Sequence, residues 1–248
     1  MARIIALANQ KGGVGKTTSA INLGAALAEQ GRRVLLVDID PQASLTDALH
    51  IDASTLERSI YDVLTRQVPL SDILQQAGSL TVAPATIDLA AAEMQLISEM
   101  GREQLLADAL ATVAMQFDDI LIDCPPSLGI LTINALTAAD SVLIPVECHY
   151  MALRGLAQLV QSIEKIQRRT NPRLQIVGVI PTMFNDRTVH EGEVLGMLRE
   201  QFPGKVAMPI RRSIKFAETA LAGKPMIEYD PAHPGGQAYR DLARELLQ

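Results

Sequence analysis

Residues 9–18 constrain the fold of this chain more than any other stretch, and their sequence is Asn-Gln-Lys-Gly-Gly-Val-Gly-Lys-Thr-Thr. An apolar run at 4–8 precedes them, and apolar residues at helical spacing follow them. This order predicts a strand, a glycine-rich loop and a helix N-terminus, where backbone N–H groups and the helix dipole bind phosphate. In such a loop Lys16 is expected to reach the β- and γ-phosphates of a nucleotide and the Thr17 hydroxyl to bind Mg²⁺.

The length and composition of the chain favour one large α/β domain. The 248 residues are enough to bury a substantial core, and 48% of them are hydrophobic. We therefore expect a single domain over 1–248, a doubly wound, mostly parallel sheet flanked by helices. Aromatic residues make up 3% of the chain, so a stacking surface for single-stranded nucleic acid is not indicated. The net charge of -6 argues against a globally basic nucleic-acid binder, and any DNA contact must be a local patch.

Membrane and secretion signals are not apparent in the sequence. No apolar run reaches the roughly 18 residues that a spanning helix needs, and no charged-then-apolar leader precedes the first expected strand. We therefore expect a cytoplasmic protein with no membrane partner. Cys124 and Cys148 are too few for a disulfide framework or for a metal cluster within one chain, and buried free thiols are the default interpretation.

Two acidic motifs follow apolar strands and are candidates for the phosphate site. The run Val34–Val37 is followed by Asp38 and Asp40 in the sequence D-I-D-P-Q. Ile120–Ile122 leads to Asp123 in the same way, which is typical of a Walker B strand whose carboxylate binds Mg²⁺ through water. Because ligands bind at the carboxyl ends of parallel strands, these carboxylates are expected near the glycine-rich loop. A helix N-cap is the alternative role for Asp38 or Asp40.

Other apolar runs predict the remaining elements. Met94, Ile97 and Met100 recur at one-turn spacing, and we interpret them as the packing stripe of a helix and not as a cofactor site. Residues 43–115 are expected to be helical around a single short strand. Strands are expected at 80–83, 141–146, 174–181 and 205–208, and helices at 89–100, 104–115, 151–169 and 237–247.

The glycine-rich loop departs from the usual phosphate-binding pattern at two positions. Gln10 stands where a glycine is usual, and Lys11 adds a second lysine that phosphate binding within one chain does not need. The run K-G-G-V-G-K-T-T resembles the deviant Walker A motif of the ParA/MinD superfamily of P-loop ATPases, in which the first lysine is the signature residue. D-I-D-P-Q resembles switch I of that family, and D-C-P-P, which begins at Asp123, resembles its switch II. The resemblance is closest to small, Soj-like ParA partitioning ATPases and extends over essentially all 248 residues, including G-K-P-M-I-E-Y-D-P near the end.

This resemblance implies an enzyme that hydrolyses ATP to ADP and phosphate with Mg²⁺ as cofactor. Asp40 would hold the Mg²⁺ shell and orient the attacking water, and Lys11 would reach across an ATP-bound homodimer to the phosphates of the other subunit. The residues implied to bind nucleotide are Lys11, Gly12, Gly13, Val14, Gly15, Lys16, Thr17 and Thr18 in the loop, and Thr182, Met183, Pro209 and Ile210 around the adenine. The residues implied at the metal are Thr17, Asp40 and Asp123.

The resemblance also implies a role in DNA partitioning. The ATP-bound dimer would bind nonspecific double-stranded DNA of the nucleoid, and hydrolysis stimulated by a ParB-like adaptor would release it, which segregates or positions chromosome or plasmid DNA. Arg187 and Lys215 match positions of a basic surface that contacts DNA phosphates in similar proteins. Dimerisation doubles a weak patch, so an acidic protein can still bind DNA. Acidic residues interrupt the basic ones here, and a solvated mixed face is the alternative interpretation.

Three other functions are compatible with the same fold. A MinD-like positioning ATPase that acts on a membrane surface or a non-DNA cargo would need a basic amphipathic tail, whereas residues 240–247 are expected to form a docked terminal helix. A nitrogenase-reductase-like redox protein would need cysteines that bridge a cluster between subunits. A biotin-pathway synthetase or a kinase-like enzyme would need an acceptor pocket, of which the sequence gives no sign.

Overall fold

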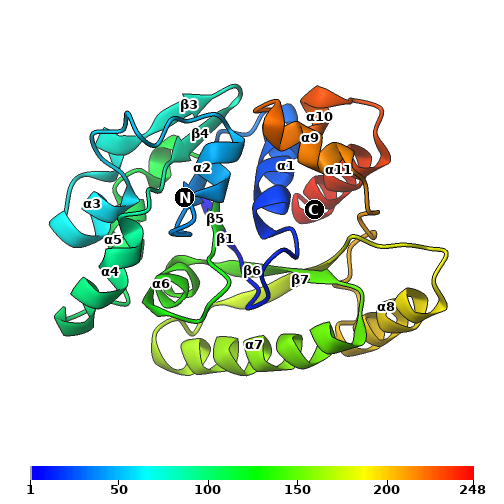
Figure 1. Ribbon diagram of the computed structural model, residues 1–248. Coiled ribbons are helices and arrows are strands. Elements are labelled where there is room, and N and C mark those ends of the chain that lie inside the picture. Colours follow the sequence, from blue (N-terminus) through cyan, green and yellow to red (C-terminus); the bar gives the residue numbers. More distant parts are fainter. Residues whose placement is uncertain (1) are drawn as a thin grey trace.

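The computed structural model describes residues 2–248, and a seven-stranded sheet with the strand order β3-β4-β2-β5-β1-β6-β7 lies at its centre (Figure 1). All neighbouring strands are parallel except β3 and β4. The prediction of a doubly wound, mostly parallel sheet is confirmed. The strands are β1 (Arg3–Leu7), β2 (Val34–Asp38), β3 (Gln75–Ala77), β4 (Leu80–Ala83), β5 (Asp119–Asp123), β6 (Ser141–Glu147) and β7 (Gln175–Thr182).

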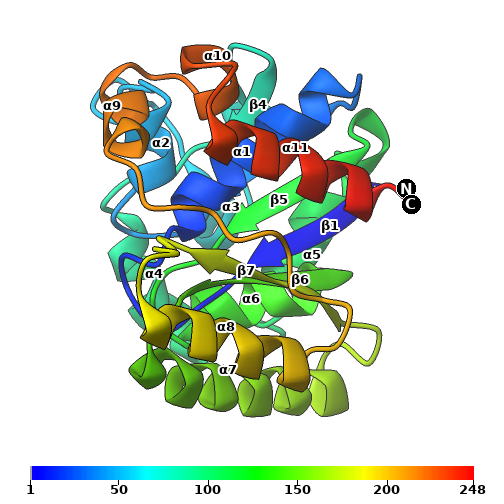
Figure 2. The same cartoon turned by 90° about the vertical axis from the view of Figure 1, so that its right-hand side faces the viewer.

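Helices cover both faces of this sheet (Figures 1 and 2). The longer ones are α1 (Lys16–Glu29), α6 (Ile130–Ala138), α7 (Tyr150–Arg169), α8 (Val189–Gln201) and α11 (Pro234–Leu246). The shorter ones are α2 (Ser44–Ala48), α3 (Ile60–Arg66), α4 (Leu89–Gln95), α5 (Leu105–Ala111), α9 (Lys215–Leu221) and α10 (Met226–Tyr229), with 3-10 turns η1 (Leu70–Ile73), η2 (Leu96–Ser98) and η3 (Ala114–Gln116). One core lies between the sheet and α1, α2, α10 and α11, and the other lies between the sheet and α3 to α8.

The central strands are buried along their whole length. Every residue of β2 and β5 is buried, as expected for strands that are covered on both faces. The carboxylate of Asp119 is therefore buried at the start of β5, where it forms ion pairs with Arg3 and Arg32 at 2.7 Å each. A buried charge is tolerated when it is paired and hydrogen-bonded, so these arginines are needed at the amino end of the sheet. The sequence-based prediction did not identify this cluster.

The last helix, α11, packs against α1. The Arg240 guanidinium pairs with Glu29 at 2.6 Å, and the buried Tyr239 hydroxyl lies 2.9 Å from Ser19 Oγ. The expected docked terminal helix is thus present, and it begins earlier than predicted, at Pro234. None of the helices in residues 2–248 is both long enough and apolar enough to cross a membrane.

Several predicted elements differ from the structure. Residues 43–115 contain a second strand, β3, which pairs with β4 across a turn in which Gly78 has a φ of 61°. The helix expected at 89–100 ends at Gln95, and the helix expected at 104–115 ends at Ala111. The strand expected at 205–208 is reduced to one bridge between Val206 and Val179. It lies between a glycine with positive φ and a proline, which both limit regular strand pairing.

The interpretation of Met94, Ile97 and Met100 as a packing stripe is wrong. Their exposed fractions are 74%, 66% and 95%. The buried side of this segment consists of Leu89, Ala92 and Leu96. Several faces of the segment carry apolar residues, so spacing alone did not identify the face that packs.

Gly24 determines how closely α1 approaches the sheet. A Cβ atom at this position would lie 2.8 Å from Leu36 Cδ2, whereas a Cβ atom at Gly155 in α7 would meet no atom within 4 Å. We expect Gly24→Val to lower the free energy of unfolding by about 1–3 kcal/mol, because overpacking a core forces neighbouring side chains to move. The control Gly155→Val should change it by less than about 0.5 kcal/mol. Urea denaturation of both variants measures the difference, and equal effects would contradict the assignment.

Candidate nucleotide and magnesium site

The loop between β1 and α1 has the backbone geometry of a phosphate cradle. Gly13 and Gly15 have φ values of 72° and 84°, in the left-handed region that glycine adopts without strain. Gly15 precedes α1 and has no side chain to cap it, so the first N–H groups of the helix can bind an anion. The prediction of a strand, a loop and a helix over this stretch is confirmed.

The side chains of Lys16 and Thr17 take up different positions in this loop. Lys16 is 6% exposed, and its Nζ donates to the Lys11 carbonyl at 3.4 Å. The Thr17 hydroxyl donates to Asp123 Oδ2 at 2.6 Å. The loop is therefore connected to the carboxyl end of β5, next to β1 in the sheet.

Asp38 and Asp123 lie side by side at the ends of β2 and β5, whose Cα atoms are paired in register. Asp38 accepts hydrogen bonds from the Thr46 hydroxyl at 2.8 Å and from the Thr46 N–H at 3.0 Å. It thereby holds the loop after β2 against the first turn of α2, close to the capping role considered for it. Asp40 is 8% exposed and accepts from the Gln42 N–H at 2.9 Å.

The environment of Asp123 fits a divalent cation. Its Oδ1 is buried and has no hydrogen-bond partner within residues 2–248. Burial raises the pKa of Asp123, and the nearby charge of Asp38 raises it further. A hard cation coordinated or bridged by water at Oδ1 would satisfy this oxygen and favour the ionised carboxylate. Thr17 and Asp123, in contact, and Asp40, on the neighbouring loop, are thus the residues that would hold Mg²⁺ together with phosphate oxygens.

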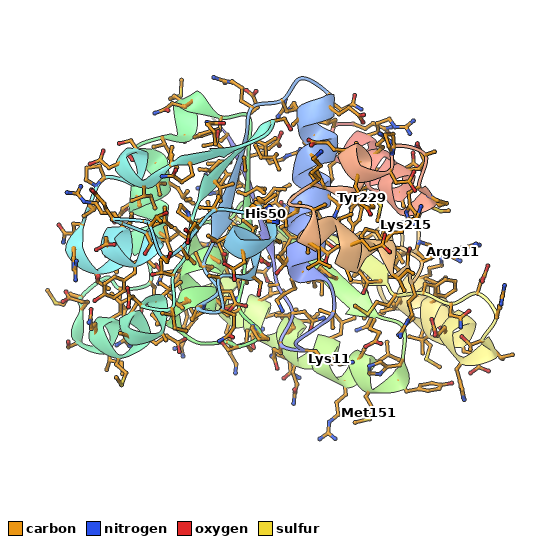
Figure 3. The ribbon with its side chains drawn as sticks, turned by 45° about the horizontal axis from the view of Figure 1, so that its top comes forward. Lys11, His50, Met151, Arg211, Lys215 and Tyr229 are labelled. Carbon is orange, nitrogen blue, oxygen red and sulfur yellow. The ribbon has the colours of Figure 1, made fainter. Side chains whose placement is uncertain are left out.

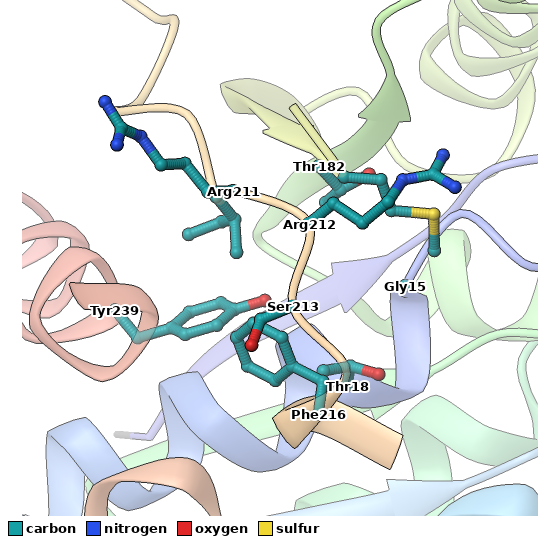
Figure 4. Close-up of a pocket in the computed structure, with 10 residues that line it drawn as sticks. Gly15, Thr18, Thr182, Arg211, Arg212, Ser213, Phe216 and Tyr239 are labelled. Atoms are coloured by element: carbon teal, nitrogen blue, oxygen red, sulfur yellow. The ribbon is translucent and has the colours of Figure 1, made fainter. Parts of the chain in front are cut away.

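A cavity of about 150 Å³ lies beside the glycine-rich loop (Figure 4). Thr182, Met183 and Ile210, which were predicted around the adenine, line it, and Pro209 does not. The Thr182 hydroxyl donates to the Val14 carbonyl at 2.8 Å and so links the cavity wall to the loop. The other lining residues are Gly15, Thr18, Arg211, Arg212, Ser213, Phe216 and Tyr239.

Phe216 and Tyr239 are cavity residues that sequence reasoning missed. They meet edge to face, with ring centroids 6.3 Å apart, and come from α9 and α11 (Figure 4). No local motif marks either residue, because each reaches the cavity only through the packing of α9 and α11 around α1. Met183 has a φ of 53°, which is unusual for a residue with a long side chain and is typical of strain stored at a functional site.

The basic residues predicted to contact DNA lie in exposed segments. Arg187 is exposed in the loop between β7 and α8, and Lys215 begins α9. Lys215 Nζ pairs with Asp230 at 2.5 Å, and Arg211 pairs with Asp186 at 2.6 Å. Figure 3 shows Lys215 and Arg211 on the same side of the molecule. Both cations are thus partly neutralised by acidic residues of the same chain.

Comparison with known proteins establishes the family. A family model described as an AAA domain matches residues 2–176. The sporulation initiation inhibitor protein Soj of Bacillus subtilis is 48% identical over 249 residues, which cover 99% of this chain and 98% of that protein. The chain belongs to the ParA/MinD family of P-loop ATPases. The chromosome partitioning protein ParA of Myxococcus xanthus is 45% identical, with 99% of this chain and 88% of that protein covered.

A solved structure adds the ligands of a similar protein. The cobyrinic acid a,c-diamide synthase of Mycobacterium smegmatis, with bound ADP and magnesium, is 43% identical with a TM-score of 0.87, and the match covers 100% of this chain and 94% of that one. The predictions of an ATPase and of ATP and Mg²⁺ as its cofactors are confirmed at the level of the family.

Replacement of Asp123 should separate stability from activity. A carboxyl group whose pKa is raised above its ordinary value of 3.8 stabilises the fold at low pH and costs stability as the pH rises, because the unfolded chain releases the proton more easily. We expect Asp123→Asn to raise the unfolding temperature of the nucleotide-free protein at pH 8 by about 2–4 °C, which corresponds to about 1 kcal/mol in a chain of this size. The gain should be smaller at pH 5.

The same variant should lose Mg²⁺-dependent ATP hydrolysis by about 10- to 100-fold, because the carboxylate that would hold the cation is gone. Thermal denaturation at the two pH values and phosphate release measure the two effects. If Asp123→Asn has a lower unfolding temperature than the parent protein at pH 8, the ionised Asp123 carboxylate does not destabilise the fold.

Proposed function

We propose that this protein is a DNA-partitioning ATPase of the ParA/Soj type. Two subunits associate when ATP and Mg²⁺ bind, the dimer binds double-stranded DNA without reading its sequence, and hydrolysis stimulated by a ParB-like adaptor releases it. Repeated binding and release on the nucleoid segregates or positions a chromosome or plasmid. The names of the similar proteins Soj and ParA support this proposal.

The different positions of the two lysines in the loop carry the proposal. Lys16 is buried beside the phosphate cradle, whereas the Lys11 side chain is 45% exposed and points toward the end of β6. Lys16 and the backbone N–H groups therefore serve the nucleotide of their own subunit. Lys11 is free of that task and is available to a second subunit that approaches the same face, where it would stabilise charge on the phosphates.

Asp40 is the residue proposed to orient the attacking water. It lies two residues beyond the end of β2, on the loop that Asp38 holds against α2. This loop brings a carboxylate to the same end of the sheet as Asp123, where a bound Mg²⁺ would act as a Lewis acid toward the phosphates. Asp38 keeps the loop in place and Asp40 acts on the water.

Two other candidates gain less support. In a MinD-like protein acting on a membrane surface, an apolar helix face must be free for lipid. The apolar side of α11 is already buried, with Tyr239, Leu242 and Ala243 packed in the core beside α1. The likeness to a cobyrinic acid a,c-diamide synthase suggests a synthetase, and ATP hydrolysis that depends on cobyrinic acid and not on DNA would favour it.

The role of Lys11 can be tested by mixing variants. We expect Lys16→Ala to lose ATP binding, and Lys11→Ala to bind ATP nearly normally yet fail to dimerise and hydrolyse it. Asp40→Ala should bind ATP and remain on DNA as a dimer. A mixture of Lys11→Ala with Asp40→Ala should regain hydrolysis, because the second variant donates Lys11 to the intact Asp40 site of the first.

Dimer formation in the mixture is checked first, by sizing with a non-hydrolysable ATP analogue. A mixed dimer that forms and stays inactive would count against the action of Lys11 across the dimer. Loss of ATP binding in Asp40→Ala would contradict the role of that residue.

The DNA surface makes a separate prediction. Arg187→Glu or Lys215→Glu should weaken the binding of all DNA sequences in the ATP state and lower the slope of log affinity against log salt by about one for each DNA phosphate that is no longer neutralised. Because Asp230 neutralises Lys215, Asp230→Asn should strengthen DNA binding. Filter binding at several salt concentrations measures these changes. If both Glu variants dimerise normally and bind DNA at low salt with unchanged affinity, Arg187 and Lys215 are solvated surface residues that do not contact DNA.

A further inference from the structure

The Lys11 ammonium contacts side chains of its own subunit. Its Nζ lies 2.6 Å from Glu147 Oε2 and 2.5 Å from His149 Nε2. Glu147 is the last residue of β6 and His149 immediately precedes α7, so both acceptors lie at the carboxyl ends of the strands. Figure 3 shows Lys11 on the same side of the molecule as Met151 in the first turn of α7. The contacts of the Lys11 ammonium are thus with groups at the end of β6 and the start of α7.

The backbone on both sides of this contact is held in place. Glu147 is paired with Thr182 of β7, which itself bonds to the Val14 carbonyl of the loop. On the other side, Asn9 accepts from the Lys11 N–H at 3.0 Å and donates to the Pro145 carbonyl at 2.6 Å. The loop and β6 are therefore connected twice, once through Asn9 and once through the Lys11 side chain.

Glu147 also contacts the wall of the nucleotide cavity. Its Oε1 lies 3.3 Å from Nη2 of Arg212, a residue that lines the cavity. The hydrogen bond from Lys11 lowers the pKa of Glu147, and the charges of Lys11 and Arg212 lower it further, so the carboxylate is ionised. One carboxylate thus joins Lys11 to a residue that a nucleotide would touch.

We propose that Glu147 is a positioning residue that retains Lys11 in its own subunit, so that the ATP-bound dimer forms only when Lys11 leaves Glu147 for the phosphates of the partner subunit. The inference rests on the proposed action of Lys11 across the dimer. The side chains of the pair are 45% and 24% exposed, and an ion pair with this exposure is weak enough to break reversibly. A nucleotide that binds in the cavity and moves Arg212 would change the charge around Glu147. This change would in turn alter the strength of the ion pair between Glu147 and Lys11.

The contact itself can be measured without dimerisation. Lys11 in the nucleotide-free protein is acetylated with acetic anhydride, and the rate is followed by mass spectrometry of the Lys11 peptide. We expect the rate to rise about threefold in Glu147→Gln and further in Glu147→Ala, because a freed amine is more accessible. The control Glu193→Gln removes the same charge from a neighbouring helix, where Glu193 accepts from the Tyr150 hydroxyl and contacts no lysine, and it should leave the rate unchanged.

The consequence for assembly is measured in an Asp40→Ala background, in which ATP is not consumed. Analytical ultracentrifugation with ATP and Mg²⁺ gives the protein concentration at half dimerisation. We expect Glu147→Gln to lower this concentration at least threefold and Glu193→Gln to leave it unchanged. When Lys11→Ala is introduced into the same chain, Glu147→Gln should no longer lower the concentration at half dimerisation.

Each failure has a distinct outcome. Unchanged acetylation of Lys11 in both Glu147 variants would show that the retaining contact is not made, and the proposed function would stand without it. Faster acetylation with an unchanged or higher dimerisation midpoint would also overturn the inference, because Glu147 would then not oppose assembly. If Asp40→Ala alone forms no dimer with ATP while acetylation still rises, the proposed function fails and the inference fails with it.

Discussion

The site depends on the placement of β5 between β1 and β2. In this order the last residues of the three strands are level, with Leu7 beside Asp123 and Asp123 beside Asp38. The loop after β1 supplies the phosphate cradle, β5 supplies the carboxylate that contacts Thr17, and β2 supplies the loop that carries Asp40. A shift of one residue in either register would turn Asp123 to the other face of the sheet and separate it from Thr17.

Several residues near the glycine-rich loop lower the stability of the fold. Asp38 and Asp123 are buried carboxylates in neighbouring positions, and both have a raised pKa because burial disfavours their charge. Ala43 and Met183, which lie after β2 and β7, have positive φ values that cost energy in residues other than glycine. These costs lie at the carboxyl edge of the sheet. At the amino end of the sheet, Asp119 is neutralised by Arg3 and Arg32. This pairing is expected for a buried carboxylate that has a structural role and binds no ligand.

The sequence was sufficient to predict those parts of the molecule that depend on local patterns. The glycine-rich loop, the strands that end at Asp38 and Asp123, and the α/β class follow from runs of neighbouring residues. The outward face of Met94 and Ile97 could not be predicted, because apolar residues occur on several faces of that short segment. The antiparallel β3 is only a few residues long and lacks a strong apolar alternation.

Residues brought to the site from distant segments were also missed. Tyr239 and Phe216 reach the cavity because α9 and α11 pack around α1, and Glu147 reaches Lys11 because β6 lies beside β1. The sequence around these residues contains no motif that indicates nucleotide binding or a contact with Lys11. Only the tertiary arrangement places them at the site. Pro209 shows the converse, since its neighbour Ile210 lines the cavity and Pro209 does not.

The contact between Tyr239 and Ser19 has a consequence for synthesis of the chain. The glycine-rich loop is translated long before α11, yet Tyr239 from α11 lines the cavity beside that loop and forms a hydrogen bond with Ser19 of α1. While α11 is still inside the ribosome, the cavity lacks one wall and α1 exposes the apolar surface that α11 later covers. A nascent chain therefore cannot complete the wall of this cavity until α11 has emerged and docked against α1.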